Sequence, residues 1–478
     1  MAVALILVGA FVPAPLAILV VPVALLPWLL KAPERGVYLL VAAAVVVEIF
    51  PLAWPDSLTD RIPLFQNLSN VGVPGLAMSP VEVLMVEAGA VGLARAASAG
   101  TLRLPRGPLP MAYLAFMAVV AVAEIHGLFS GGDFKLSLWE LRPQVYGFVL
   151  FLLASGLVKD RRQLATLAMV FLLAVLLKAV LGDYRWQFTA NHDLGQRETL
   201  LAHEDSYFML LYVVAVVVAL VWLRRRAVLM PLLLGSPLVA LCLLANQRRA
   251  GLFALAGAVM AVAALVIRFE PRVRRQAVLL TAVAAVAAVA FIASSWNQQY
   301  GIRGQLVRPV RSLIDPGSRD TSSDAYRTAE NGNLLVSFQR DPILGMGFGM
   351  PYLTVYPQAD ISMIYPLWNV IPHNSLLWVP MRMGVPGLMT FWALIGMGVL
   401  QAGAVVRNGR DPLVRAMAAM AIGAIVAELL VAYGDLQLES YRNLIVVGAI
   451  LGVVNNLPRM EKAEPPPTPA LPLEGGGR

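Results

Sequence analysis

The sequence predicts an all-α, polytopic integral membrane protein with about 12–13 transmembrane helices and one long extracytoplasmic loop. Of its 478 residues, 59% are apolar and only 14% are charged, and the mean hydropathy is +0.72. These values lie outside the range of soluble domains. Segments such as 213–221 and 282–290 are continuously apolar, whereas a membrane β-barrel would show alternating hydrophobicity over about ten residues.

Apolar runs long enough to cross a bilayer recur along the whole chain. The first is rich in proline and is expected to be kinked or divided into two short helices. It lacks the basic start and the small-residue cleavage site of a signal peptide, so we expect it to be retained. The predicted spans are residues 3–30, 36–53, 79–98, 109–125, 143–158, 163–181, 204–223, 228–246, 249–267, 277–296, 373–406, 412–433 and 438–456.

Basic residues fall in every second connection between these spans, as the positive-inside rule requires of the cytoplasmic side. The opposite connections include residues 297–372, whose many aromatic side chains are typical of an ordered segment. We therefore expect one transmembrane domain, 1–460, that includes an ordered extracytoplasmic loop, 297–372. Residues 461–478, with their proline and glycine runs, are expected to form a disordered cytoplasmic tail.

Several classes of function are disfavoured by composition. The single cysteine, Cys242, lies in an apolar run, so neither a disulfide framework nor a thiolate metal cluster is available. The basic residues set membrane topology, so we expect no nucleic-acid partner. We also expect no cofactor and no metal. Glu48, Glu87 and Lys178 lie within spans and are interpreted as structural pairs or interfacial groups.

Two adjacent arginines, Arg248 and Arg249, lie in a tight turn on the predicted outer side, where the positive-inside rule disfavours arginine. One interpretation is that they snorkel to the membrane interface. The other is anion binding, because a guanidinium offers bidentate donors to phosphate and a helix N-terminus adds its dipole. Ala250 and Gly251 would let a bulky ligand approach the backbone.

A polar run leads directly into the span at 204–223. It begins with Arg197, six residues before His203, and includes Asp205 and Ser206. Asp205 or Ser206 can cap the following helix, and Asp205 is also a weaker candidate for binding substrate. A metal held by His192 and His203 with neighbouring carboxylates is the less favoured alternative, because the spacing matches no closed site.

The long loop ends with further candidate residues. Gly345, Gly347 and Gly349 favour a tight turn that brings backbone close to a ligand or a helix, because no strand–helix unit follows that would indicate nucleotide binding. His373 begins the next helix, where the helix dipole disfavours the imidazolium and a neutral base is favoured. A simple capping role is the alternative. Asn374 offers hydrogen bonds beside it, and Arg327 lies on the same membrane face.

Four separated stretches resemble one family, the O-antigen ligases and the related O-antigen and exopolysaccharide polymerases. They are the polar entry at 197–208, the turn at 248–251, the long loop from Arg327 through 342–349, and the helix start at His373 with Gly384-Val385-Pro386-Gly387 beyond it. The resemblance covers about residues 197–400. The chain departs from the family pattern at Glu204-Asp205 and at Gln247-Arg248, which leaves the register of the second arginine open by one residue.

The resemblance implies a metal-independent, inverting glycosyltransferase of the bacterial cytoplasmic (inner) membrane, with its active site facing the periplasm or cell exterior. Its donor would be a glycan on undecaprenyl pyrophosphate, and its acceptor a hydroxyl of a lipid, glycan or protein. Carried over, Arg197 and Arg249, with Arg248 as the alternative register, would bind the pyrophosphate, and His373 would be the catalytic base. Arg327, Asn374 and Asp205 are the weaker substrate-binding candidates.

Two other classes compete with this interpretation. A transporter or lipid-linked oligosaccharide flippase would also place charged residues in a polytopic bundle, although near the membrane midplane. A purely structural assembly partner would leave the convergence of arginine and histidine unexplained. The sequence does not separate a ligase from a polymerase, and it does not give the sugar or the oligomeric state.

Overall fold

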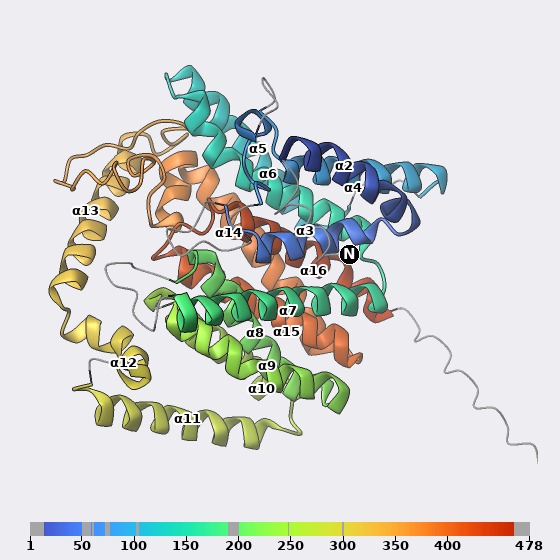
Figure 1. Ribbon diagram of the computed structural model, residues 1–478, viewed down its shortest axis with the longest axis vertical. Coiled ribbons are helices and arrows are strands. Elements are labelled where there is room, and N and C mark those ends of the chain that lie inside the picture. The colour runs from blue at the N-terminus through green and yellow to red at the C-terminus, as the bar shows by residue number, and fades with distance from the viewer. Residues whose placement is uncertain are drawn as a thin grey trace, which may run out of the picture.

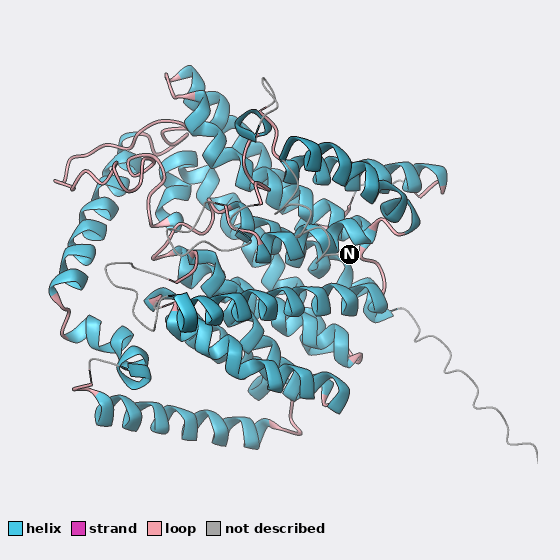
Figure 2. Ribbon diagram, in the orientation of Figure 1, coloured by secondary structure: helices cyan, strands magenta, loops and turns pink. Residues whose placement is uncertain are grey.

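The computed structural model describes residues 14–49, 59, 62–71, 77–101, 105–189, 200–246, 248–298 and 301–462. Within these ranges the secondary structure is helical and contains no strand (Figure 2). The predicted all-α membrane fold is therefore confirmed. The tail from residue 463 onward and the first thirteen residues lie outside the described ranges.

Every predicted span has a corresponding helix, and the boundaries differ by several residues at most of the ends. The helices are α2 (Ala14–Lys31), α3 (Glu34–Val46), α4 (Pro80–Ser98), α5 (Pro108–Phe129), α6 (Phe134–Leu157), α7 (Arg161–Tyr184), α8 (His203–Val218), α9 (Arg226–Ala245), α10 (Arg249–Phe269), α11 (Arg274–Ser295), α14 (Ser375–Asn408), α15 (Pro412–Ala432) and α16 (Tyr441–Lys462). Short π-helical segments extend α7 to Thr189 and α8 to Leu223.

Among the described residues, nine of these helices are long and apolar enough to cross a membrane by length and composition alone. The other four are α2, α3, α4 and α6. α3 has 13 residues, or about 20 Å, against about 30 Å of hydrocarbon. α4 and α6 each carry three charged side chains in their sequences. The N-terminal part of the bundle is thus shorter and more polar than its hydropathy runs predict.

Ion pairs join helix ends that the arginine pattern assigns to the same side. On the predicted cytoplasmic side, Arg161 pairs with Asp411 at 3.0 Å and Arg415 with Glu270 at 2.5 Å. On the predicted outer side, His126 pairs with Asp341 at 3.5 Å. The helix ends therefore sort into two faces as the charge pattern predicts, while the assignment of one face to the cytoplasm stays a prediction.

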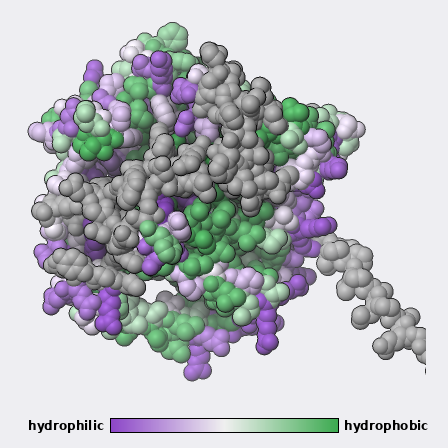
Figure 3. Space-filling view, in the orientation of Figure 1, coloured by the Kyte–Doolittle hydropathy of each residue, from purple (hydrophilic) through white to green (hydrophobic). Residues whose placement is uncertain are grey.

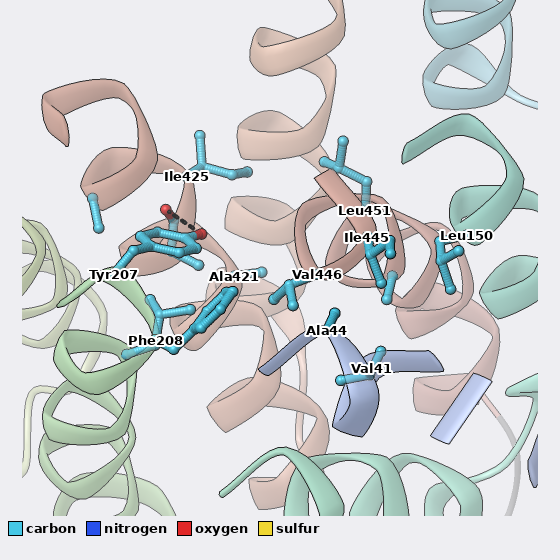
Figure 4. Close-up of a cluster of buried hydrophobic side chains, with 14 of the residues drawn as sticks. Val41, Ala44, Leu150, Tyr207, Phe208, Ala421, Ile425, Ile445, Val446 and Leu451 are labelled. Carbon is cyan, nitrogen blue, oxygen red and sulfur yellow. Dashed lines mark hydrogen bonds between the residues drawn. The ribbon is translucent and has the colours of Figure 1, made fainter. Parts of the chain in front are cut away.

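The core lies where α8, α15 and α16 meet α3 and α6 (Figure 4). Tyr207 is fully buried and donates a hydrogen bond to the carbonyl of Ala424 at 3.2 Å. α16 approaches α6 closely because Gly448 faces the backbone of Gly147, where an added Cβ would lie 2.1 Å from a carbonyl oxygen. Small residues at such contacts let helices pack backbone to backbone, as is usual within membranes.

The C-terminal carbonyls of α3 are bound by two buried cations from distant helices. Arg442 on α16 donates to the carbonyls of Ala44 and Val45, and Lys178 on α7 donates to that of Val46. Ala44, Val45 and Val46 are buried, so these last-turn carbonyls are shielded from water. The bonds therefore satisfy carbonyl groups that would otherwise be exposed to a low-dielectric interior.

Carboxylates neutralise these two cations. Lys178 forms an ion pair with Glu48, and Arg442 forms one with Asp205. Both carboxylates are buried. Glu48 and Lys178 thus form the structural pair that their positions within predicted spans indicate.

The surface of the bundle has an extensive apolar flank. In Figure 3, green hydrophobic surface occupies the middle of the lower half, and purple hydrophilic residues gather toward its left and right edges. α11 lies along the lower edge in Figure 1, and the apolar window of this helix has 0% of its residues buried inside the protein. Such a helix needs an apolar surrounding, which supports its placement in a membrane.

Residues 297–372 contain two helices, α12 (Gly301–Ile314) and α13 (Ser318–Arg340), followed by a folded chain of turns. The glycines of these turns have left-handed backbone, with φ of 70° at Gly345 and 75° at Gly347. A Cβ on Gly347 would lie 2.4 Å from the backbone of Gly127 on α5. The glycine run therefore forms a tight turn packed against helices, in agreement with the interpretation of the sequence.

A buried ion pair fixes these turns to the bundle. Arg382 on α14 is 0% exposed and binds Glu140 on α6 at 2.5 Å. The same guanidinium donates to the carbonyls of Gly347, Met350 and Val370. The turns that precede His373 are thereby held at a defined place above α6 and α14.

Candidate functional site

The candidate site is organised by α13, which runs across the ends of the bundle at the left edge of Figure 1. Asp324, Arg327, Glu330 and Asn331 recur at three- and four-residue spacing on this helix, which places them on one side of it. Asp324 contacts α10, Arg327 approaches the loop between α15 and α16, and Glu330 and Asn331 both contact the start of α14. α13 thus brings together groups from α10, α14 and the loop between α15 and α16.

His373 immediately precedes α14 and is held by Glu330. Its Nδ1 lies 3.1 Å from Oε1 of Glu330, and its backbone N–H donates to Oε2 at 3.1 Å. The Glu330 side chain is 1% exposed, whereas the His373 side chain is 21% exposed. One buried carboxylate therefore fixes both the backbone and the ring of a histidine that remains accessible.

Two aromatic rings confine the imidazole. Tyr326 meets it edge to face at 5.8 Å between ring centroids, and Tyr365 lies at 6.2 Å. Burial raises the pKa of Tyr326 to about 12, so this ring stays neutral. Within the described part of the chain, Nε2 of His373 makes no hydrogen bond. The ring is oriented by Glu330 and offers its second nitrogen to a ligand.

Arg248 belongs to a second histidine–carboxylate pair. Its Nη2 lies 3.0 Å from Nε2 of His203, at the start of α8, and Nδ1 of the same ring lies 2.7 Å from Oδ2 of Asp435. The carboxylate of Asp435 is also 3.9 Å from Nη1 of Arg248. Burial alone would raise the pKa of Asp435, but the hydrogen bond from His203 and the guanidiniums of Arg248 and Arg327 together hold it well below its ordinary value.

Arg249 turns toward α12 and α13 instead. It donates to Oγ of Ser312 on α12 at 3.0 Å and lies 3.4 Å from Oδ1 of Asp324 on α13. Its side chain is 23% exposed, against 16% for Arg248. The two adjacent arginines therefore serve different parts of the site, and Arg248 is the one that joins the histidine cluster.

Arg327 and Asn374 lie beside these groups. Nη1 of Arg327 would be 3.5 Å from a Cβ at Gly434, next to Asp435. Asn374 caps α14 by accepting from the N–H of Leu377 at 3.1 Å, and its amide donates to Asn331 at 3.1 Å. The structure thus brings Arg327, Arg248 and Asp435 together, and it ties the residue after His373 to α13.

The remaining two predicted residues are not placed in this group. Asp205 is 0% exposed, accepts from the N–H of Ala202 at 3.1 Å and pairs with Arg442, so it has the helix-capping place that the sequence allowed. Its carboxylate is directed into the interior of the protein, toward Arg442. Arg197 lies outside the described residues, and so does His192 of the alternative metal site.

Three residues of the site, Asp324, Glu330 and Asp435, were not assigned a site role from the sequence, and His203 was considered only for the less favoured metal site. All four are acids or bases that contact partners at least 43 positions away. The available signal was the charged and amide spacing from Asp324 to Asn331, which becomes a single face only if this part of the loop is helical.

This arrangement combines a base with a cationic surface. A histidine oriented by a buried carboxylate can accept a proton from a hydroxyl at Nε2. Guanidiniums nearby can bind an anion and stabilise negative charge that develops on a leaving group. Among the described residues, no group of three or more His, Cys, Asp or Glu side chains is placed to hold a metal ion.

Comparison with known families gives one match. The family model described as O-antigen ligase matches residues 234–392, a third of the chain. This segment includes Arg248, Arg249, α12, α13 and His373, whereas His203 and Asp435 lie outside it. No curated protein sequence matches the chain.

Proposed function

The match over residues 234–392 supports assigning this chain to the O-antigen ligase and polymerase family, and from that premise we propose a specific membrane glycan-transfer reaction. The protein transfers or polymerises a glycan from an undecaprenyl-pyrophosphate donor to an acceptor hydroxyl. The reaction takes place at the extracytoplasmic face of the bacterial inner membrane. The donor and the face are the parts of this proposal that go beyond the family assignment.

The observation that carries the proposal is the geometry of His373. Both oxygens of buried Glu330 bind this residue, and Nε2 is directed to no protein partner among the described residues. A base held in this way can take the proton of the acceptor hydroxyl as the hydroxyl attacks the anomeric carbon. Glu330 orients the ring and stabilises the imidazolium that forms, without taking the proton itself.

The arginines act on the other end of the reacting bond. As the bond to the sugar breaks, negative charge develops on the pyrophosphate, and guanidiniums stabilise it. Arg248, Arg249 and Arg327 are the described candidates, with Arg197 as the further candidate that the sequence predicts. These side chains supply the positive charge, so we propose that no metal is required.

A direct displacement fixes the stereochemistry. The acceptor oxygen attacks from the side opposite to the leaving pyrophosphate, so one bond forms as the other breaks and the configuration at the anomeric carbon is inverted. We therefore expect the product linkage to have the opposite anomeric configuration to the donor. NMR of the purified product tests this expectation, and a retained configuration would contradict it.

The test of function is glycan transfer by the purified protein with a lipid-linked oligosaccharide. Release of undecaprenyl pyrophosphate should accompany transfer and should persist in excess EDTA. We expect His373→Ala to lower kcat by about 10²- to 10⁴-fold. The variant should remain folded and should still bind the donor, because the substitution leaves every helix of the bundle in place.

A matched control is provided by His126→Ala. His126 is also on the outer face and pairs with a carboxylate, Asp341, at 3.5 Å, and its exposure of 26% resembles that of His373. This variant should keep kcat within about threefold of the native value. Near-normal transfer by a folded His373→Ala protein would exclude the catalytic role.

A further inference from the structure

The loop between α15 and α16 contains a buried carboxylate, Asp435, on which three cationic or hydrogen-bonding groups converge. Its side chain is 3% exposed. His203 contacts it at 2.7 Å, Arg248 lies 3.9 Å away, and Arg327 lies beside the preceding residue, Gly434. These three residues come from α8, the start of α10 and α13. One carboxylate thus links three separate elements of the outer face.

The hydrogen bonds of His203 have only one consistent direction. A guanidinium donates and never accepts, so Nε2 of His203 must accept from Arg248. The ring proton then resides on Nδ1 and is donated to Asp435. His203 is therefore a neutral relay that transmits the position of a buried carboxylate to Arg248.

The net charge of these four side chains favours the binding of an anion. Arg248 and Arg327 are positive, Asp435 is negative and His203 is neutral, which leaves one net positive charge on the four side chains. The nearest contact of Arg248 within the cluster is a neutral imidazole, and the carboxylate stands farther away. These contacts orient the guanidinium of Arg248.

The same loop is bonded to the start of α14. Oγ of Ser375 accepts from the N–H of Gln437 at 2.9 Å, and it lies 2.5 Å from Oε2 of Glu439. Ser375 follows His373 by two residues. The loop therefore holds the arginine cluster in a fixed relation to the histidine that we propose as the base.

We propose that Asp435 and His203 are positioning residues for the donor-binding arginines, and that they hold Arg248 and Arg327 to receive the pyrophosphate group of the donor. This inference rests on the proposed function and adds residues that lie outside the segment matched by the family. It also assigns the central place at the anion site to Arg248, with Arg249 bound to α12 and α13.

The first experiment measures kcat and KM for the lipid-linked donor in Asp435→Asn. The amide keeps the shape of the side chain but loses the charge that orients His203 and attracts Arg327. We expect KM for the donor to rise about 10- to 100-fold, in the range seen when an outer hydrogen-bond partner of a ligand-binding residue is lost, with kcat changed less than about threefold. A residue with a structural role alone would lower the amount of folded protein and leave KM unchanged.

Asp411→Asn is the matched control. Asp411 flanks the other end of α15, caps that helix by accepting from the N–H of Val414, and pairs with Arg161 at 3.0 Å. The variant loses a carboxylate that, like Asp435, contacts a basic side chain of another helix, but on the opposite face of the bundle. KM for the donor should be unchanged in Asp411→Asn.

A double-mutant cycle tests the relay. If His203 transmits the effect of Asp435, the losses in donor affinity caused by His203→Ala and Asp435→Asn should be clearly less than additive. Additive losses would show that the two side chains act separately and would overturn the relay. Should Asp435→Asn fail to fold, Asp435→Glu and His203→Ala address the same question, because the first moves the carboxylate and the second removes the relay to Arg248.

Direct binding of undecaprenyl pyrophosphate, without a glycan, separates this inference from the proposed function. If the native protein binds no such lipid, the proposed function fails. If the native protein binds it and Asp435→Asn binds it equally well, the positioning role fails while the function stands. Weaker binding by Asp435→Asn and His203→Ala, with unchanged binding by His373→Ala, is the expected result.

Discussion

The predicted outer face carries two histidine–carboxylate pairs that differ in the hydrogen bonding of the second ring nitrogen. In the pair of His373 and Glu330, Nδ1 binds the carboxylate and Nε2 has no hydrogen-bond partner within the described part of the chain. In the pair of His203 and Asp435, Nδ1 likewise faces the carboxylate, but Nε2 accepts from Arg248. The carboxylates are similarly buried, at 1% and 3% exposure.

This difference separates two roles that residue type alone cannot distinguish. A general base needs a nitrogen that a substrate proton can reach, which the first pair provides. A ring with both nitrogens bound to the protein serves instead to transmit orientation, as outer partners of bound ligands do. The comparison therefore supports the proposed roles of His373 as the base and of His203 as a positioning residue.

The largest expected effect is the contrast between alanine variants of the two histidines. His373→Ala should lower kcat by about 10²- to 10⁴-fold, whereas His203→Ala at saturating donor should keep kcat within about threefold of native. The reason is that only the first ring accepts the acceptor's proton. Steady-state kinetics at saturating donor measure both values, and an equal loss of kcat in the two variants would break the comparison.

The next effect concerns the carboxylate behind the base. Glu330→Gln keeps a side chain of similar shape but removes the charge that stabilises the imidazolium, so kcat should fall about 10²-fold or more. KM for the donor should change little, in contrast to Asp435→Asn. A rise in KM with unchanged kcat would instead place Glu330 with the donor-binding groups.

The stability of the protein is expected to depend on pH through Glu439, which lies in the loop that connects Asp435 to the start of α14. Burial raises the pKa of Glu439 to about 8 from the ordinary 4.5, and the folded protein therefore holds this proton more tightly than the unfolded chain. Its contribution to stability is fully present below about pH 4.5 and is lost as the pH rises toward 8, by up to about 1.4 kcal/mol per pH unit.

Thermal unfolding in detergent between pH 5 and pH 8 measures this dependence. Glu439→Gln mimics the protonated side chain, so its Tm should fall less with rising pH than the native Tm. The variant Glu461→Gln, on the predicted cytoplasmic side, is the control. If the native protein and Glu439→Gln show the same slope of Tm against pH, the folded carboxyl does not retain its proton.

The smallest effect is expected where α13 meets the start of α14. Asn331→Ala removes one hydrogen bond to Asn374, which is worth about 1 kcal/mol. We expect a slightly lower Tm and a kcat reduced less than about threefold, because Glu330 still orients His373. A kcat as low as that of Glu330→Gln would mean that the placement of α13, and not the carboxylate itself, controls the base.

Much of the fold was predictable because hydropathy and loop charge act locally. Each apolar run gives a helix, and the arginines of alternate connections sort the helix ends into two faces. The polar character of α4 and α6 was less predictable, because residues such as Glu140 are tolerated only through partners far along the chain. Burial of a charge depends on its partner, and a single sequence does not show the partner.

The site was predictable in part, for the same reason. Arg248, Arg249 and His373 stood out because each lies at the start of a predicted membrane span, on a side where charge needs an explanation. Glu330 and Asp435 carried no such local signal. They become part of the site through contacts across 43 and 232 positions, with His373 and His203 respectively, and loop closure of this kind leaves no trace in local composition.

The capping of α3 by Arg442 has a consequence for biosynthesis. α3 is synthesised well before α16, which is the last helix of the described chain. Until Arg442 arrives, the carbonyls of Ala44 and Val45 and the carboxylate of Asp205 lack their partner in the membrane. The end of α3 therefore completes its hydrogen bonding only after α16 has been synthesised and inserted, so a chain truncated before α16 exposes unsatisfied carbonyls to quality control.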